Sequence, residues 1–392
     1  MSERGRYAAR AVSSISEIGP ADWDRLAGTA NPFLSYAFLN ALEDSGCCAA
    51  ETGWLPRHVV VEDEAGKAVG ALPAYLKNHS HGEYIFDHGW ADAYERAGGR
   101  YYPKLQASVP FTPATGPRLL TEPGPDAERH RKAVLSAAVQ LTAHLKASSL
   151  HITYPTEAEW RQMGEAGLLL RTSEQFHWQN QGFGDFDDFL ATLTARKRKM
   201  IRKERARAVA NGIDIRIFSG SELRPAHWDA FYAFYIDTGS RKWGSPYLNR
   251  TFFELLHERL ANRVALVMCE RAGRWIAGAL NLIGDDTLFG RNWGCLEDHD
   301  CLHFEACYYQ AIDFAIARGL NWVEAGAQGP HKIHRGYLPR HTYSAHWIAD
   351  PALRKAIAEH LEREREQVDW EIAEVGREYS PYRKNKNSSM PH

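Results

Sequence analysis

Long apolar runs are missing from this sequence. No stretch reaches the roughly 18 apolar residues that a membrane-spanning helix requires, and the opening segment MSERGRYAARAVSSISEIG has no apolar core of the kind found in signal peptides. A large excess of one charge is missing too, since 47 Lys and Arg residues face 49 Asp and Glu residues. We therefore expect a cytoplasmic protein without a transmembrane segment, and the near-neutral charge disfavours nonspecific binding to nucleic acid.

Cysteine pairs of the C-x-x-C type are also absent, although the chain has six cysteines. Free thiols are expected in a reducing compartment. Cys295, Cys301, His303 and Cys307 lie close together in the sequence, but their spacing fits no standard zinc finger, so we expect no metal site.

The length of 392 residues suits two domains. With 44% hydrophobic and 24% charged residues, the composition is that of an ordinary globular protein. The order of predicted elements places a flexible N-terminus at 1–20, domains at 21–180 and 181–378, and a polar tail at 379–392.

An internal repeat supports this division. HVVVEDEAGKAVGALPAY (58–75) and ALVMCERAGRWIAGALNL (265–282) both read as an apolar strand, a charged turn with Ala-Gly and a basic residue, and a second apolar strand. Gly66 aligns with Gly273, and Gly70 aligns with Gly278 after a slip of one residue. Each copy is followed by a further strand, a long helix and a short apolar strand, which predicts an α/β fold with mixed sheets flanked by helices.

Several longer strings resemble a known bacterial family. NPFLSYAFLNALEDSG, GWLPRHVVVED, FYIDTGSRKWGSPYL and EAGAQGPHKIHRGYLP are similar to the FemAB-like family, described as peptidoglycan biosynthesis/recognition. The resemblance covers about residues 20–385. It implies two GNAT-like (N-acyltransferase) domains and a transferase that moves an acyl or aminoacyl group to an amine acceptor, in cell-wall precursor metabolism.

The donor stays open between acyl-CoA and aminoacyl-tRNA, and we expect no required cofactor. The sequence has no long heptad-patterned segment for the helical arm that some FemAB enzymes carry. The acetyl-CoA signature of GNAT proteins is matched only by RQMGEA at 161–166, inside a predicted helix, where no free backbone N–H groups are available for a pyrophosphate. No Gly-x-Ser-x-Gly sequence occurs, so direct attack on the donor is expected.

Candidate site residues in the first half follow an aromatic-rich segment. Asp87 and His88 are candidates for a base and its orienting partner, and Tyr101 and Lys104 for binding a carboxylate or phosphate. Arg118 is a candidate partner for an anionic substrate. The alternative is an aromatic-rich loop packed on the sheet, with Arg118 at the surface.

In the second half, Lys242, Trp243 and Tyr247 follow an aromatic helix, and cations beside an aromatic ring suit a phosphate or nucleotide head group. A solvated helix end is the alternative. Arg291 and Trp293 alternate on a predicted strand, which places them on one face. His303 begins the next helix and is a candidate base.

The strongest candidate cluster begins with Glu324, which ends an apolar strand and is a candidate general base. The loop after such a strand is where open α/β sheets bind ligands. We expect Glu324 to line a pocket with its loop residues and with His303 and Trp293. The alternative is a buried ion pair from Glu324 to Arg335. The loop candidates are Gln328, His331, Lys332, Arg335 and Tyr337.

A basic run, RKRKMIRKERAR, occupies 196–207. Within the run only Glu204 is able to offset the repulsion, so we expect an anionic partner such as tRNA, a nucleotide phosphate or an anionic lipid head group, held by Arg196, Arg198, Lys199 and Arg202. Two rival functions stay open. One is a non-catalytic FemAB-like module that binds a cell-wall or nucleotide-linked ligand, and the other is an RNA-binding protein.

Overall fold

The computed structural model describes residues 7–242, 246–326 and 329–383. Its contacts divide the chain into two compact units, each made of three stretches. The first unit comprises Met1–Ser173, Pro246–Ala261 and His341–Asp369, and the second comprises Glu174–Ser245, Asn262–Arg340 and Trp370–His392. No helix in the described ranges combines the length and the apolar composition needed to cross a membrane.

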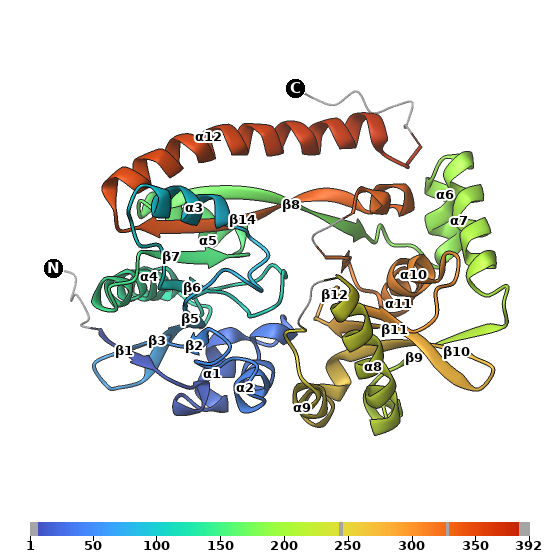
Figure 1. The fold of residues 1–392 in the computed structure, drawn as a ribbon, viewed down its shortest axis with the longest axis horizontal. Helices are drawn as coiled ribbons and strands as arrows, with labels where there is room; N and C mark the ends of the chain where they lie inside the picture. Colours follow the sequence, from blue (N-terminus) through green and yellow to red (C-terminus); the bar gives the residue numbers. More distant parts are fainter. Residues whose placement is uncertain (1–6, 243–245, 327–328, 384–392) are drawn as a thin grey trace. The chain divides into compact units, whose positions relative to one another are not determined.

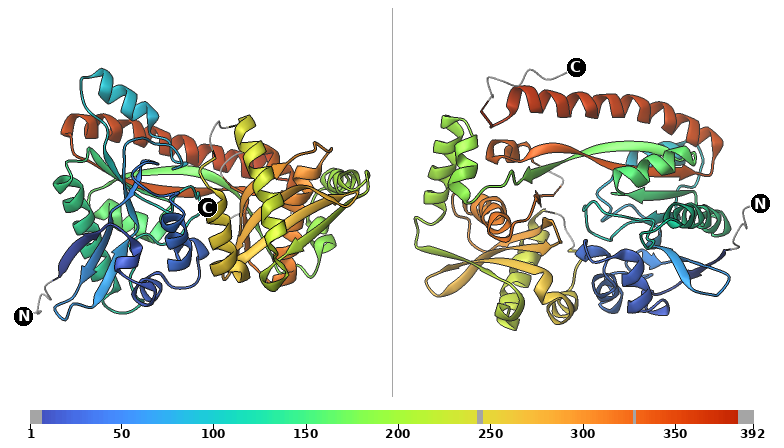
Figure 2. Two further views of the ribbon diagram at one scale, coloured as in Figure 1. Left: turned by 60° about the horizontal axis from the view of Figure 1, so that its bottom comes forward. Right: turned by 180° about the vertical axis from the view of Figure 1, so that it is seen from behind.

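The first unit alternates short strands with helices (Figures 1 and 2). Helix α9 follows much later in the sequence but packs against α2 within this unit. Its elements are β1 Ala8–Val12, α1 Pro20–Ala27, α2 Tyr36–Asp44, β2 Trp54–Pro56, β3 His58–Glu62, β4 Ala68–Leu72, β5 Ala74–Lys77, α3 His88–Arg96, β6 Lys104–Ala107, α4 Ala127–His144, β7 Ser149–Thr153, α5 Glu157–Glu165 and α9 Arg250–Leu260.

The second unit is built around a longer meander, and three elements run from one unit into the other: β8 Leu169–Gln179, β14 Leu338–Ile348 and α12 Pro351–Glu374. The elements that lie wholly in the second unit are α6 Phe186–Thr192, α7 Ala195–Ala208, β9 Ile213–Phe218, α8 Pro225–Lys242, β10 Val264–Arg271, β11 Arg274–Ile283, β12 Thr287–Cys295, α10 Leu302–Phe304, α11 Gln310–Arg318 and β13 Trp322–Glu324.

The strands form a large mixed sheet, as the sequence predicts. The strand order is β2-β5-β6-β7-β14 among those of the first unit and β8-β13-β12-β11-β10-β9 among those of the second, and β1-β3-β4 form a separate small sheet. Each unit contains one parallel pair, β6 with β7 and β12 with β13. In both cases helices connect the two parallel strands, which is the strand–helix–strand arrangement expected from the repeat.

The repeat also appears in the register of the strands. Gly70 pairs with Val61 across β4 and β3, and Gly278 pairs with Met268 across β11 and β10. A register shift follows within one or two pairs in each copy. Gly66 and Gly273 both have a positive φ in the turn between their strands, which is the conformation that glycine adopts without steric cost. The equivalence inferred from the two strings is therefore confirmed at the level of strand pairing.

Two apolar layers define the faces of the sheets. In the first unit, α4 packs on a core that includes Leu105, Leu150 and Ile152. In the second unit, α11 packs on a core that includes Leu288, Val323 and Trp178, while α8 lies against the opposite face of β11 and β12 (Figure 1). The positions of these helices decide which side chains of each strand point into a core.

Candidate functional site

The end of β13 carries the principal candidate, Glu324. Register pairs Glu324 with Phe289 on β12 and with His177 on β8. Directly paired residues point to the same face of a sheet. Their neighbours Leu288, Val323 and Trp178 point into the α11 core, so Glu324, Phe289 and His177 point to the opposite face. Glu324 is 9% exposed.

His177 was not among the residues expected from the sequence. Burial lowers the pKa of His177 to about 3, with Arg340 and Lys332 acting in the same direction, so the imidazole beside Glu324 is neutral. A neutral imidazole offers one N–H donor and one acceptor nitrogen to its neighbours. The string QFHWQ gives a weak signal, because a titratable side chain alternates there with two buried aromatic residues.

A bulge in β12 separates Trp293 from Glu324, which were expected to line one pocket. Leu280 pairs with Asn292 and the next residue, Asn281, pairs with Gly290, so Arg291 is the extra residue. The bulge shifts the alternation of side chains along β12. Trp293 therefore lies on the face of Ala277 and Ala279, which packs against Leu302 of α10. Arg291 and Trp293 remain two residues apart, on either side of Asn292, and their place on one strand face stays a prediction.

The bulge also corrects the expected pocket. His303 of α10 contacts Trp293, with ring centroids 5.3 Å apart, on the face of the sheet that α10 covers. Glu324 points to the other side. The pairing of His303 with Trp293 agrees with the sequence analysis, but a single pocket lined by both of them and by Glu324 does not.

Lys332 lies beside the chain segment that follows Glu324. Its Nζ atom donates hydrogen bonds to the carbonyl oxygens of Ala325 at 2.6 Å and Gly326 at 2.9 Å. The side chain belongs to a residue only 3% exposed, and burial lowers its pKa to about 8. Among the described residues no carboxylate lies within 4 Å of the Lys332 ammonium. A buried positive charge that is hydrogen-bonded to carbonyl oxygens and lies over the Phe176 ring therefore marks this strand end.

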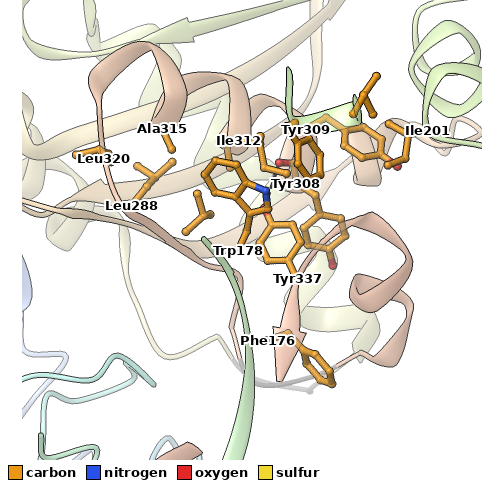
Figure 3. Close-up of a cluster of buried hydrophobic side chains, with 14 of the residues drawn as sticks. Phe176, Trp178, Ile201, Leu288, Tyr308, Tyr309, Ile312, Ala315, Leu320 and Tyr337 are labelled. Atoms are coloured by element: carbon orange, nitrogen blue, oxygen red, sulfur yellow. Dashed lines mark hydrogen bonds between the residues drawn. The ribbon is translucent and has the colours of Figure 1, made fainter. Parts of the chain in front are cut away.

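Aromatic side chains cluster where Tyr308 and His303 meet the segment that carries His331. His331 and the hydroxyl of Tyr308 are 3.0 Å apart, and the His303 ring lies 5.4 Å from that of Tyr308. Figure 3 shows Tyr308 beside Tyr337 and Trp178 in the core. Tyr337 is fully buried and donates to the carbonyl oxygen of Tyr308 at 3.1 Å. Its position is that of a core residue, whereas His303 is partly buried and His331 is exposed.

Arg335 has a different partner from the one expected. Its guanidinium pairs with Glu204 of α7, at 2.8 Å and 3.1 Å, and lies 3.4 Å from the centre of the Phe304 ring. Glu204 also accepts a hydrogen bond from Tyr309. The alternative of an ion pair from Glu324 to Arg335 is therefore wrong, because Arg335 fixes α7 to the helices of the second unit instead.

The first unit contains a separate network of buried charges. Lys104 donates to Asp87 at 2.5 Å, to Glu83 at 2.7 Å and to Ser80 at 2.7 Å, and Tyr101 donates to Asp87 at 2.6 Å. Burial alone would raise the pKa of Asp87, but the Lys104 ammonium holds it well below its usual range. Asp87, Tyr101 and Lys104 thus meet as the sequence suggested.

His88 does not join this network. It is exposed, and its ring stacks on Phe86 at 5.7 Å, so the expected pair of Asp87 with His88 is wrong. Asp87 is oriented by Lys104 and Tyr101 because its side chain points inward from the start of α3. Burial lowers the pKa of His151 to about 3. The network ends on His151 and His346, whose Nδ1 atoms are 2.7 Å apart.

Arg118 is fully buried, against the alternative of a surface residue. Its guanidinium donates to the carbonyl oxygens of Thr153 at 2.9 Å, Gly116 at 3.0 Å and Ala114 at 2.8 Å. Glu159 accepts the backbone N–H groups of Arg118 and Leu119. Arg118 thus braces the loop after β6.

The candidates after α8 fall in different units. Tyr247 belongs to the first unit and stacks on Phe111, with ring centroids 5.0 Å apart and planes 14° apart. Lys242 ends α8 in the second unit. Trp243 and Gln328 lie outside the described residues.

The basic run forms α7, and acids from elsewhere in the second unit pair with part of it. Arg202 pairs with Asp187 at 2.8 Å, and Arg205 pairs with Glu305 and Asp313. The expectation that only Glu204 offsets the repulsion is therefore wrong. Arg198 donates to the carbonyl oxygen of Leu193 at 3.4 Å. Arg196, Lys199 and Lys203 make no ion pair with the described residues.

The large mixed sheet and its helix-connected parallel strands define a mixed α/β fold. The chain belongs to the FemAB-like family, described as peptidoglycan biosynthesis/recognition, whose model matches residues 14–384. A search of curated proteins finds no match to the chain.

Solved structures share the fold at low sequence identity. FemX is 11% identical, with a TM-score of 0.54 over 89% of this chain and 100% of that chain. L-PGS from Bacillus licheniformis is 9% identical, with a TM-score of 0.50 over 85% of this chain and 98% of that chain. A conserved protein of unknown function from Bacteroides thetaiotaomicron is 11% identical, with a TM-score of 0.50 over 86% and 99% of the two chains.

Proposed function

We propose that this protein transfers an acyl or aminoacyl group to an amine acceptor, and that the reaction takes place at the end of β13. The observation that carries the proposal is the buried Lys332 ammonium, which is held by two carbonyl oxygens directly after Glu324. Membership of the FemAB-like family and the FemX fold support a transferase and a cell-wall precursor as the acceptor. Acyl-CoA and aminoacyl-tRNA are the two donors to compare.

The reaction requires a base for the amine, a group that stabilises negative charge on the carbonyl oxygen, and an acid for the leaving group. The acceptor nitrogen forms a C–N bond to the carbonyl carbon of the donor while the C–O or C–S bond of the donor breaks, and the proton of the nitrogen passes to a base. Glu324 is the proposed base, with the neutral ring of His177 opposite it on the same face. The proton lost by the amine is then returned to the leaving oxygen or sulfur.

Lys332 is proposed to stabilise negative charge that develops on the carbonyl oxygen of the donor. A buried ammonium is more effective there than one in water because little solvent screens it. Its lowered pKa also allows the ammonium and amine forms to exchange near neutral pH. Activity that depends on the charged form should fall as the pH rises through about 8.

The test is a mass-spectrometric screen of the purified chain, with acyl-CoA and aminoacyl-tRNA donors against amine acceptors that include nucleotide-linked peptidoglycan precursors. With an active pair, Glu324→Gln should lower kcat by about 10²–10⁴, and Lys332→Met by about 10²–10³. Asp298→Asn and Lys355→Met change exposed residues of the same charge types and should retain full activity.

Two outcomes would contradict the proposal. Normal turnover by folded Glu324→Gln and Lys332→Met proteins would remove the reaction from the end of β13. Tight binding of a precursor without any product from either class of donor would instead support the non-catalytic module.

A further inference from the structure

A groove on the first unit combines an aromatic floor with an acidic rim. Its volume is about 630 Å³, within the range of small-molecule sites. The rings of Trp160 and Tyr343 form the floor, with centroids 4.8 Å apart, and His341 extends the row, with its ring 6.2 Å from Tyr343. These residues come from α5 and β14, so the floor is rigid.

The rim is formed by carboxylates of α12. Glu362, Glu366 and Asp369 are spaced four and three residues apart, so they lie along one face of the helix. Glu362 and Glu366 make no ion pair with the described residues, and like charges four residues apart destabilise a helix. Asp369 accepts a hydrogen bond from His341 at 2.7 Å. The helix therefore presents a row of negative charge that the protein itself does not neutralise.

The nearby cations of the chain are engaged elsewhere. Arg365 lines the groove, but its guanidinium donates to the carbonyl oxygen of Leu170. Arg161 pairs with Glu157, which lies on the groove, at 2.6 Å. Both guanidinium groups are thus bonded to other groups, and neither makes an ion pair with Glu362 or Glu366 among the described residues.

A buried hydroxyl gives a second, independent indication of a ligand. Thr172 of β8 lines the groove and is only 5% exposed. Its Oγ1 atom has no hydrogen-bond partner among the described residues. A buried hydroxyl without a partner costs free energy, and a ligand that carries N–H groups would supply the missing partner.

We propose that this groove binds a linear aliphatic polyamine. At 1.5 Å per residue, the three carboxylates rise by about 6 Å and about 4.5 Å along α12, a repeat similar to that of ammonium groups joined by three or four methylenes. The methylene chain would cover the faces of Trp160 and Tyr343, and its ammonium groups would be attracted both by the rings and by the rim. The proposal concerns a site separate from the end of β13 and does not depend on the transfer reaction.

The test is titration calorimetry of the full chain with spermidine, without donor or acceptor. Spermidine should bind the native protein, and its affinity should fall steeply from low salt to about 0.5 M salt because the contacts are electrostatic. Glu362→Gln combined with Glu366→Gln should weaken binding at least about tenfold. Thr172→Val should weaken it about threefold, and the neutral analogue 1,4-butanediol should not bind.

The control is Asp92→Asn combined with Glu95→Gln, which removes two exposed charges from α3 at a distance in sequence from the groove. This protein should bind spermidine as the native one does. Equal affinity of the Glu362→Gln/Glu366→Gln protein and the native protein would overturn the proposal. Binding of butanediol as tightly as spermidine, or no binding of spermidine at low salt, would do the same.

Discussion

Lys77 and Lys104 are paired directly across β5 and β6, so two ammonium groups are neighbours inside the first unit. Glu83 lies between them, 2.7 Å from the Nζ atom of Lys104 and 3.5 Å from that of Lys77. Lys77 also lies 3.4 Å from the centre of the Trp54 ring. Like charges directly opposite each other destabilise a sheet, and one of the two ammonium groups is consequently easier to deprotonate.

Burial lowers the pKa of Lys77 to about 7, and Glu83 offsets this only in part. Between pH 7 and about 10.5 the unfolded chain binds more protons at this residue than the folded chain, so its contribution to the free energy of unfolding rises with pH, by at most about 1.4 kcal/mol per pH unit. We expect the stability of the native protein relative to Lys77→Met to increase by about 1–3 kcal/mol from pH 7.5 to 9.5 in urea unfolding. The exposed-site variant Lys355→Met should follow the native profile, and parallel curves for all three proteins would contradict the assignment.

Asp87 gives a prediction for acidic pH. It accepts hydrogen bonds from Lys104 and Tyr101, and Asp87→Asn would leave Glu83 as the only carboxylate paired with Lys104. We expect a loss of about 3 kcal/mol in urea unfolding at pH 7. Because the folded pKa is lowered, this stabilisation is complete above pH of about 4 and is lost as the pH falls below it. Asp92→Asn, on the exposed side of α3, should change the free energy of unfolding very little. If the difference in stability between the native protein and Asp87→Asn does not narrow in acid, the charge of Asp87 is not the cause of that difference.

Gly294 tests the packing of α8 on β12. A Cβ atom at this position would overlap the backbone of Phe234, and a backbone cannot swing aside as a flexible side chain can. We expect Gly294→Ala to destabilise the protein by about 1–3 kcal/mol. Gly89 of α3 has open space around it, so Gly89→Ala should be neutral or slightly stabilising. Equal thermal melting temperatures for both variants would show that α8 packs differently.

The unpaired cations of α7 are proposed to bind an anionic partner. Arg196, Lys199 and Lys203 are separated by three and four residues and are exposed, so they lie on one face. Arg196 and Lys199 lie near the N-terminus of the helix, where positive charge opposes the helix dipole. Replacing all three by Gln should weaken binding of tRNA in a salt-dependent way, measured by fluorescence anisotropy. Gln at Arg202 and Arg207, which are paired with Asp187 and Asp300, is compared with Gln at Arg196 and Lys199 alone, so that both proteins lose two charges. Equal losses of tRNA affinity in these two proteins would contradict the assignment.

The sequence predicted the parts of the fold that depend on local pattern. The turns at Gly66 and Gly273 follow from glycine next to charged residues between two apolar strands, and the strand–helix–strand order follows from periodicity. The meeting of Asp87, Tyr101 and Lys104 was also suggested by their closeness in the sequence.

What the sequence could not predict depends on register and on distant partners. The bulge at Arg291 reverses the face of Trp293 and removes it from the side of Glu324, yet no residue type in β12 marks it. Glu204 pairs with Arg335, 131 positions away. Arg335 pairs with Glu204 instead of Glu324 because α7 packs beside it within the second unit. His177 gains its place beside Glu324 from the pairing of β8 with β13, which lies beyond any local pattern.

The path of the chain has a consequence for dissecting the protein genetically. The first unit draws β14 and most of α12 from the last quarter of the sequence, and its apolar clusters include Ala345, Ile348, Leu353 and Leu361. A fragment that stops at the end of the first half would therefore expose part of its own interior, and the complementary fragment would carry an orphan strand and an orphan helix. Split versions should regain solubility only when the two fragments are co-expressed.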